Sequence, residues 1–213
     1  QRNVLGVAPG VQMHRMGNIP REEQDQLALE SHQKAALAYD SGFFGDLVVP
    51  YSGLNRDNNL RGDTTLAKLA SLKPAFDKTA GTLTAGNSTP LTDGAAAVLL
   101  ASDDWAKAHG HKPLAYLTAY ETAAVDFASG RKDGLLIAPA FAVPRMLARM
   151  GLKLQDFDFY EIHEAFAAQV MGCVAAWEDP AYCKEQLTGY KRPRHIECGR
   201  GAAMHRKGQP ETP

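Results

Sequence analysis

The sequence predicts an α/β fold, because segments with helical spacing of apolar residues alternate with short, continuous apolar runs. Residues 95–101 (AAAVLLA) form one such run, of strand length and without a charge, which is typical of a strand buried on both faces. Residues 157–162 (FDFYEI) precede an almost wholly apolar stretch at residues 164–177. A strand followed at once by a buried helix is the unit from which layered α/β folds are built.

The first helix is expected to begin near Pro20 and to end at Gly42. Proline is favoured in the first turn of a helix, and Glu22 and Glu23 place carboxylates at the positive end of the helix dipole. Apolar residues between positions 27 and 38 recur at helical spacing. Glycine favours the left-handed conformation that ends many helices.

The middle of the chain is irregular. Residues 43–50 are expected to form a short strand, and residues 51–80 a long polar stretch with one short helix at about 64–72. A long irregular stretch in a globular chain usually wraps a functional site or another domain. A turn-rich loop at 81–90 then leads into the strand at 95–101.

The remaining elements continue the alternation of helices and strands. Ser102 or Asp103 can cap a short helix that Gly110 stops, and Gly151 can end a second helix. The expected elements are helix 103–109, strand 113–120, helix 139–150, strand 157–162 and helix 164–177.

Composition excludes several classes of function. Hydrophobic residues make up 45% and charged residues 22% of the 213 residues, and a net charge of −1 favours neither nucleic acid nor an acidic membrane as a partner. No apolar run approaches the roughly 18 residues of a transmembrane helix, and residues 1–10 form no secretory signal. The cysteines (Cys173, Cys183 and Cys198) form no C-x-x-C pair, so neither a metal nor a dithiol site is expected. Their odd number suits the reducing cytoplasm.

The strongest local pattern is FYEIHEAFAAQV at residues 159–170. A strand would deliver His163 to the edge of a sheet where a buried helix begins, and free N–H groups at a helix start can polarise a ligand oxygen. The dipole there disfavours imidazolium, which favours a neutral histidine that donates one N–H. A structural histidine remains the alternative. The zinc motif H-E-x-x-H is excluded because position 167 is alanine.

A second pattern is the polar loop GTLTAGNSTP at residues 81–90. Loops of this composition present hydroxyls and backbone amides to polar ligands, although an ordinary surface turn has the same composition. A third pattern, DNNLRGD at 57–63, begins like a calcium loop. Arg61 and Lys68 occupy its fifth and twelfth positions, where calcium needs oxygen ligands, so that reading is rejected.

In combination, three stretches resemble the thiolase family, and most closely the β subunits of bacterial fatty-acid oxidation complexes. They are REEQDQLALESHQKAALA, GTLTAGNSTPLTDGAAAVLLAS and DFDFYEIHEAFAAQV. The resemblance implies a layered αβαβα fold of two similar halves with an inserted loop domain, of which this chain would be an incomplete part. The expected partition is an unmatched segment at 1–18, loop domain at 19–80, the end of the N-terminal half at 81–112, the start of the C-terminal half at 113–187, and an unmatched, disordered tail at 188–213.

The resemblance also implies the chemistry and the site. Thiolases cleave 3-ketoacyl-CoA with CoA, without a tightly bound cofactor; CoA is a substrate. His163 matches the oxyanion-hole position with Glu164 in support, Ala165 and Phe166 match residues beside the pantetheine and acyl chain, and Thr89 matches a contact to the CoA arm. The family's nucleophilic cysteine precedes the matched region. No Gly-His-Pro occurs, and Cys198-Gly-Arg does not match the family's Cys-x-Gly.

These departures favour a fragment that is inactive alone. The resemblance further implies a homo-oligomer and, in the complete enzyme, a hydratase/dehydrogenase subunit as partner. Two alternatives stay open. One is a non-catalytic thiolase-like module that binds CoA or a protein partner, and the other is a degenerate product without a stable fold.

Overall fold

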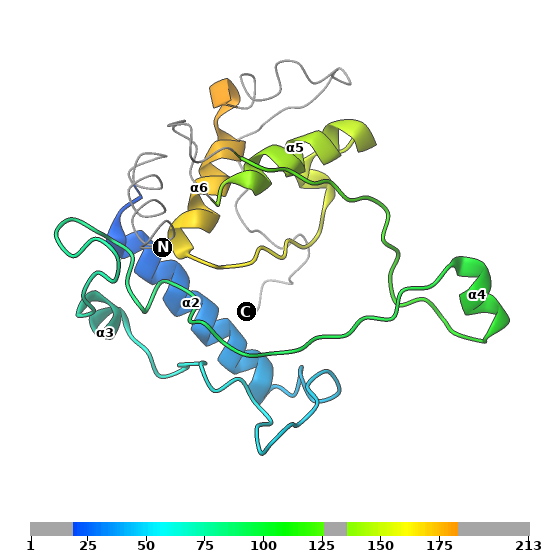
Figure 1. The fold of residues 1–213 in the computed structure, drawn as a ribbon, viewed down its shortest axis with the longest axis horizontal. Helices are drawn as coiled ribbons and strands as arrows, with labels where there is room; N and C mark the ends of the chain where they lie inside the picture. Colours follow the sequence, from blue (N-terminus) through cyan, green and yellow to red (C-terminus); the bar gives the residue numbers. More distant parts are fainter. Residues whose placement is uncertain (1–18, 126–135, 183–213) are drawn as a thin grey trace, which may run out of the picture.

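A computed structural model of the chain describes residues 19–125 and 136–182. Residues 1–18, expected to be an unmatched segment, and residues 188–213, expected to be a disordered tail, lie outside these ranges. Figure 1 shows α2 running beneath the 81–90 loop, with α5 and α6 packed together and α4 standing apart at the end of two long extended segments. The described elements are α2 (Arg21–Asp40), α3 (Leu66–Ala70), α4 (Asp103–Ala108), α5 (Ala138–Met150), the 3-10 helix η1 (Leu154–Asp156) and α6 (Ala167–Glu178).

The helices at the predicted places form for the predicted reasons. α2 begins directly after Pro20 and is followed by Gly42 with a φ of 77°, a backbone conformation that glycine adopts without strain. The hydroxyl of Ser102 accepts the N–H of Trp105 at 3.2 Å and so caps α4. Gly151 ends α5 in the left-handed conformation. The predictions of these helices, and of the short helix that is α3, are confirmed.

The predicted strands at 43–50, 95–101, 113–120 and 157–162 are wrong as elements of this structure. Within residues 19–125 and 136–182 only three isolated β-bridges occur, and no strand. Residues 43–48 form hydrogen-bonded turns instead, in which the N–H groups of Leu47 and Val48 donate to the carbonyl of Phe44. A strand needs hydrogen bonds from a neighbouring strand, and among the described residues no bridge involves the other three segments. Their side chains remain uncovered, with Val98, Leu99 and Leu100 at 81%, 77% and 73% exposure. The predicted burial of the apolar run at 95–101 is therefore wrong for the part of the chain that the structure describes.

The main apolar core lies between α5 and α6. Ile137, Ala140 and Phe141 pack against one face of α6, where Cys173 and Trp177 are buried. Burial of large side chains of this kind contributes about 1.5–3 kcal/mol each. A second cluster joins α6 to the 81–90 loop around Leu83 and Ala168, and α2 contacts both α3 and α6. In the part of the chain described, no helix is long and apolar enough to cross a membrane.

Candidate functional site

The 81–90 loop pairs with the residues that lead into α6. The Thr89 N–H donates to the carbonyl of Ala165 at 2.9 Å, and the Ala167 N–H donates to the carbonyl of Asn87 at 3.0 Å. Ser88 and Phe166 form an antiparallel bridge between them. The structure thus brings Thr89 and the Ala165–Phe166 pair together, although they lie far apart in sequence.

This pairing also explains where α6 begins. Phe166 is held in an extended conformation, with φ −145° and ψ 137°, and acts as the N-cap of a helix that starts at Ala167. The predicted start at Glu164 is therefore wrong. His163 lies four positions before the helix, in an exposed segment without regular secondary structure. Neither a strand end nor the first turn of α6 therefore places its imidazole at the positive end of the helix dipole, which acts over about one turn.

Beneath the loop, Asn87 and Asp25 form a buried polar contact. Asn87 is 3% and Asp25 2% exposed, and Asn87 Nδ2 donates to Asp25 Oδ1 at 3.0 Å. The other oxygen of Asp25 accepts Nε of Arg21 at 2.7 Å. Arg21 also donates to the carbonyl of Leu69 at 2.6 Å. Since buried polar groups are costly unless paired, this chain of contacts fixes α2, the loop and α3 relative to one another.

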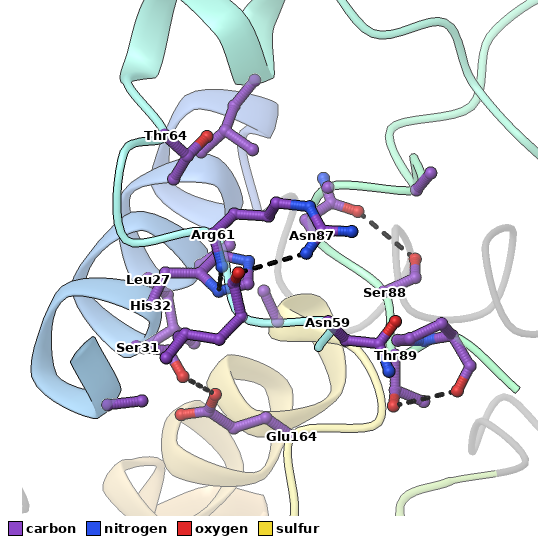
Figure 2. A pocket seen from close by; sticks show the side chains of 18 of the residues that line it. Leu27, Ser31, His32, Asn59, Arg61, Thr64, Asn87, Ser88, Thr89 and Glu164 are labelled. Carbon is purple, nitrogen blue, oxygen red and sulfur yellow. Dashed lines mark hydrogen bonds between the residues drawn. The ribbon is translucent and has the colours of Figure 1, made fainter. Parts of the chain in front are cut away.

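A cavity of about 450 Å³ opens beside this network, a size within the range of small-molecule sites. Its walls come from α2, α3, residues 57–64, the loop at 85–90, Glu164 and Ala167. Figure 2 shows Arg61 and His32 on one wall, and Ser31 directed toward Glu164. The cavity therefore combines apolar helix surface with one guanidinium, one imidazole, the carboxylates of Asp57 and Glu164, and the exposed hydroxyl of Thr89.

Hydrogen bonds hold several polar groups of this cavity in place. The Ser31 hydroxyl donates to Glu164 Oε2 at 2.6 Å, which joins the middle of α2 to the segment before α6. The Arg61 N–H donates to His32 Nδ1 at 3.3 Å, and Arg61 Nη1 donates to the carbonyl of Asn58 at 2.7 Å. In these contacts the guanidinium donates through Nη1 to a carbonyl oxygen, and its other N–H groups can donate to an anion.

The structure places the predicted site residues in two groups. Thr89 and Glu164 line the cavity, and Ala165 and Phe166 adjoin Thr89 through the backbone pairing. His163 is not among the residues that line the cavity. Sequence reasoning missed Arg61 and His32, because the stretch that contains Arg61 was expected only in general terms to wrap a site. It also missed Asn87 as an individual residue, although it singled out the loop.

Thiol and metal chemistry find little support in the described ranges. Cys173 is fully buried, and burial raises the pKa of its thiol, so it is a poor nucleophile. Among residues 19–125 and 136–182, no three His, Cys, Asp or Glu side chains cluster closely enough to hold a metal ion.

Comparison with known proteins decides the family. The model of the thiolase N-terminal domain matches residues 5–104, and that of the thiolase C-terminal domain matches residues 111–183. The chain belongs to the thiolase family. A 3-ketoacyl-CoA thiolase of Pectobacterium carotovorum is 45% identical over 206 residues, and one of Yersinia pestis is 42% identical over the same length. Each alignment covers 87% of this chain and 46% of the relative, so this thiolase chain spans about half the length of the curated relatives it matches.

Solved structures confirm the predicted thiolase fold. The human mitochondrial 3-ketoacyl-CoA thiolase in complex with CoA is 36% identical, with a TM-score of 0.70 over 78% of this chain and 41% of that one. The Bacillus anthracis acetyl-CoA acetyltransferase is 38% identical, with a TM-score of 0.67 over 78% and 43%. The dimeric peroxisomal thiolase of Saccharomyces cerevisiae is 34% identical, with a TM-score of 0.70 over 81% and 44%. The chain therefore has part of the thiolase fold, as the sequence predicts, although its described residues contain no strand.

Proposed function

We propose that this chain forms part of the acyl-CoA site of an enzyme that cleaves 3-ketoacyl-CoA with CoA to acetyl-CoA and a shortened acyl-CoA, or runs the reverse condensation, in fatty-acid β-oxidation. The observation that carries the proposal is the pairing of Thr89 with Ala165 beside the cavity. It joins the two segments that the resemblance assigns to the CoA arm and the acyl chain. The names of the relatives and the CoA complex of one structural neighbour support it.

The cavity suits the chemistry of CoA. Coenzyme A carries phosphates at one end and a thin pantetheine arm, with two amide groups, at the other. Arg61 offers a guanidinium to the phosphates, which it can bind through paired N–H groups. The exposed hydroxyl of Thr89 and the apolar surface of Leu27 and Ala28 offer contacts to the arm. Phe166 stacks edge-on against Phe76 at 5.9 Å between ring centroids, which fixes an apolar surface beside Ala165 for the acyl chain.

His163 is the proposed donor to the oxyanion. Its exposed position next to Glu164 leaves the imidazole accessible to a thioester bound along Ala165. Glu164 is the proposed support, because its hydrogen bond with Ser31 anchors the segment to α2. The partition of the chain into loop-domain residues 19–80, residues 81–112 of the N-terminal half and residues 113–187 of the C-terminal half belongs to the same proposal.

The complete enzyme is proposed to be a cytoplasmic homo-oligomer that associates with a hydratase/dehydrogenase subunit. It takes CoA as a substrate and holds no tight cofactor. A second candidate function is non-catalytic binding of CoA in the same cavity. Both candidates require CoA to bind the cavity, so binding is measured first.

Isothermal titration of the purified chain with CoA tests the proposal. Arg61→Ala should weaken CoA binding about 10- to 100-fold, because hydrogen bonds to charged groups contribute about 1.5–3 kcal/mol. Arg56→Ala is the matched control, since Arg56 is exposed and pairs with Asp40 away from the cavity. Failure of the parent chain to bind CoA refutes both candidates. An equal loss of CoA affinity in both variants would show that binding depends on the net charge of the chain and that CoA does not occupy this cavity.

A further inference from the structure

We propose that Asn87 is a positioning residue of the CoA site and that it acts through its buried contact with Asp25. This inference rests on the proposed function, because its consequence is the placement of Thr89 and Ala165 for CoA. Asn87 is placed by three segments at once: α2 below it, its own loop around it, and the start of α6 beside it.

The side-chain amide of Asn87 is fully used. Nδ2 donates to Asp25 Oδ1 at 3.0 Å and to the carbonyl of Thr82 at 3.0 Å. Oδ1 accepts the N–H of Thr84 at 2.8 Å. An amide carries both donors and acceptors, whereas a carboxylate only accepts and an aliphatic side chain does neither. At this buried position, asparagine therefore donates to the carboxylate oxygen of Asp25 that Arg21 does not bind and accepts the backbone N–H of Thr84.

The backbone of the same residue carries the effect to the site. The carbonyl of Asn87 accepts the N–H of Ala167 at 3.0 Å, and two residues later the N–H of Thr89 donates to Ala165. Because Asn87 anchors the loop, it thus fixes the positions of Thr89 and Ala165 relative to the first turn of α6. If the side chain were released from Asp25, the paired backbone at 87–89 and 165–167 could shift. The α5–α6 core would stay packed, because its residues lie elsewhere.

Asn87→Asp separates positioning from simple loss of packing. The variant keeps the size of the side chain but opposes two carboxylates, and one of a close pair is expected to hold its proton to a higher pH than usual. Near pH 8 both are ionised and repel. Near pH 5.5 one proton can be shared, which restores a donor between positions 87 and 25. The other charged or titratable groups nearby are Arg21, which is bound to Asp25, and His32, Asp57, Arg61 and Glu164, which line the same cavity as Asn87. Arg21 also donates to the carbonyl of Leu69 in α3 and to that of Leu72 just after it. The parent and the variants share all these groups, so the ratio at each pH isolates the change at position 87.

The experiment measures CoA affinity of the full chain at about pH 8 and about pH 5.5 for the parent, Asn87→Asp and Asn87→Ala, each as a ratio to the parent at the same pH. Both variants should bind CoA about tenfold more weakly near pH 8. Near pH 5.5 the Asp variant should return to within about threefold of the parent, and the Ala variant should not. Asn55→Asp is the matched control, because Asn55 is exposed and away from the cavity.

Amide hydrogen exchange provides a readout that does not need CoA. The amides of Thr89 and Ala167 should exchange faster in both Asn87 variants than in the parent, with the Asp variant slowing again near pH 5.5 after correction for intrinsic exchange. Unchanged exchange at these two amides overturns the inference, as does a CoA affinity of the Asp variant that is not rescued at low pH. A parent chain that binds no CoA refutes the proposed function, and the exchange data then decide the inference alone.

Discussion

The N–H of Thr89 donates to the carbonyl of Ala165 at 2.9 Å, and this bond joins two segments that no local sequence signal connects. The contact lies between α2 and α6, where Asn87 and Asp25 support it from below. Extended backbone is stabilised by hydrogen bonds to a neighbouring segment. Residues 87–89 and the residues just before α6 supply these hydrogen bonds to each other, although neither segment belongs to a predicted strand.

Gly86 lies at a close approach between this loop and α3. A Cβ at this position would sit 2.6 Å from Leu69 Cδ2 and 2.7 Å from Leu72 Cδ1. Gly86→Ala should therefore lower the free energy of unfolding by about 1–3 kcal/mol through overpacking, as measured by urea denaturation. Gly94→Ala is the control, since a Cβ there meets no atom within 4 Å. Equal stability of the two variants would show that both leucine side chains move aside freely.

Cys173 should react slowly with alkylating reagents in the folded chain. Burial raises the pKa of its thiol, so the thiolate forms only at a higher pH than in the unfolded chain, where the value is about 8.5. The unfolded state therefore releases its proton first, and the contribution of this thiol to stability is present below about pH 8.5 and is lost as pH rises above it. Iodoacetamide labelling with Cys183 and Cys198 replaced by serine checks this. Labelling of the native chain as fast as in urea would contradict it.

A sequence prediction succeeds here where the hydrogen-bond partners of an element lie close to it in the sequence. Helices form hydrogen bonds within their own sequence, so local signals suffice to place them. Pro20 marks the start of α2, Ser102 the start of α4 and Gly151 the end of α5. A strand takes its hydrogen bonds from elsewhere, and the apolar run around Leu99 finds no partner in the described residues. A single sequence gives the pattern of burial but does not identify the surface that supplies it.

The same distinction applies to the site. The loop with Thr89 and the segment with Ala165 could be predicted, because each carries a pattern of its own. Their contact with each other, and the approach of Arg61 to His32, depend on long-range folding. The start of α6 was predicted three residues too early because helical propensity continues through Ala165 and Phe166, whereas backbone pairing with the 87–89 loop holds Phe166 extended.

The isolated chain should not cleave acetoacetyl-CoA. The family's activating Gly-His-Pro is absent from the sequence, and no cysteine matches the nucleophile. The thiol of Cys173 is buried and protonated, so it does not substitute for the nucleophile. Loss of a nucleophile and its base removes orders of magnitude in rate, because both act on one transition state. Thiolytic cleavage in the presence of CoA, above a heat-inactivated control, would refute this prediction.

His163 should act as an oxyanion donor in an enzyme restored with the missing family segments. A donor directed at developing negative charge contributes about 2.7–4 kcal/mol, so His163→Ala should lower kcat about 100- to 1000-fold. His163→Asn should be milder, because an amide N–H can still donate to the oxyanion. In both variants, iodoacetamide should alkylate the nucleophilic cysteine at the same rate as in the parent. Loss of cysteine reactivity toward iodoacetamide in His163→Ala would instead identify this imidazole as the base that activates the thiol, and it would exclude the oxyanion role.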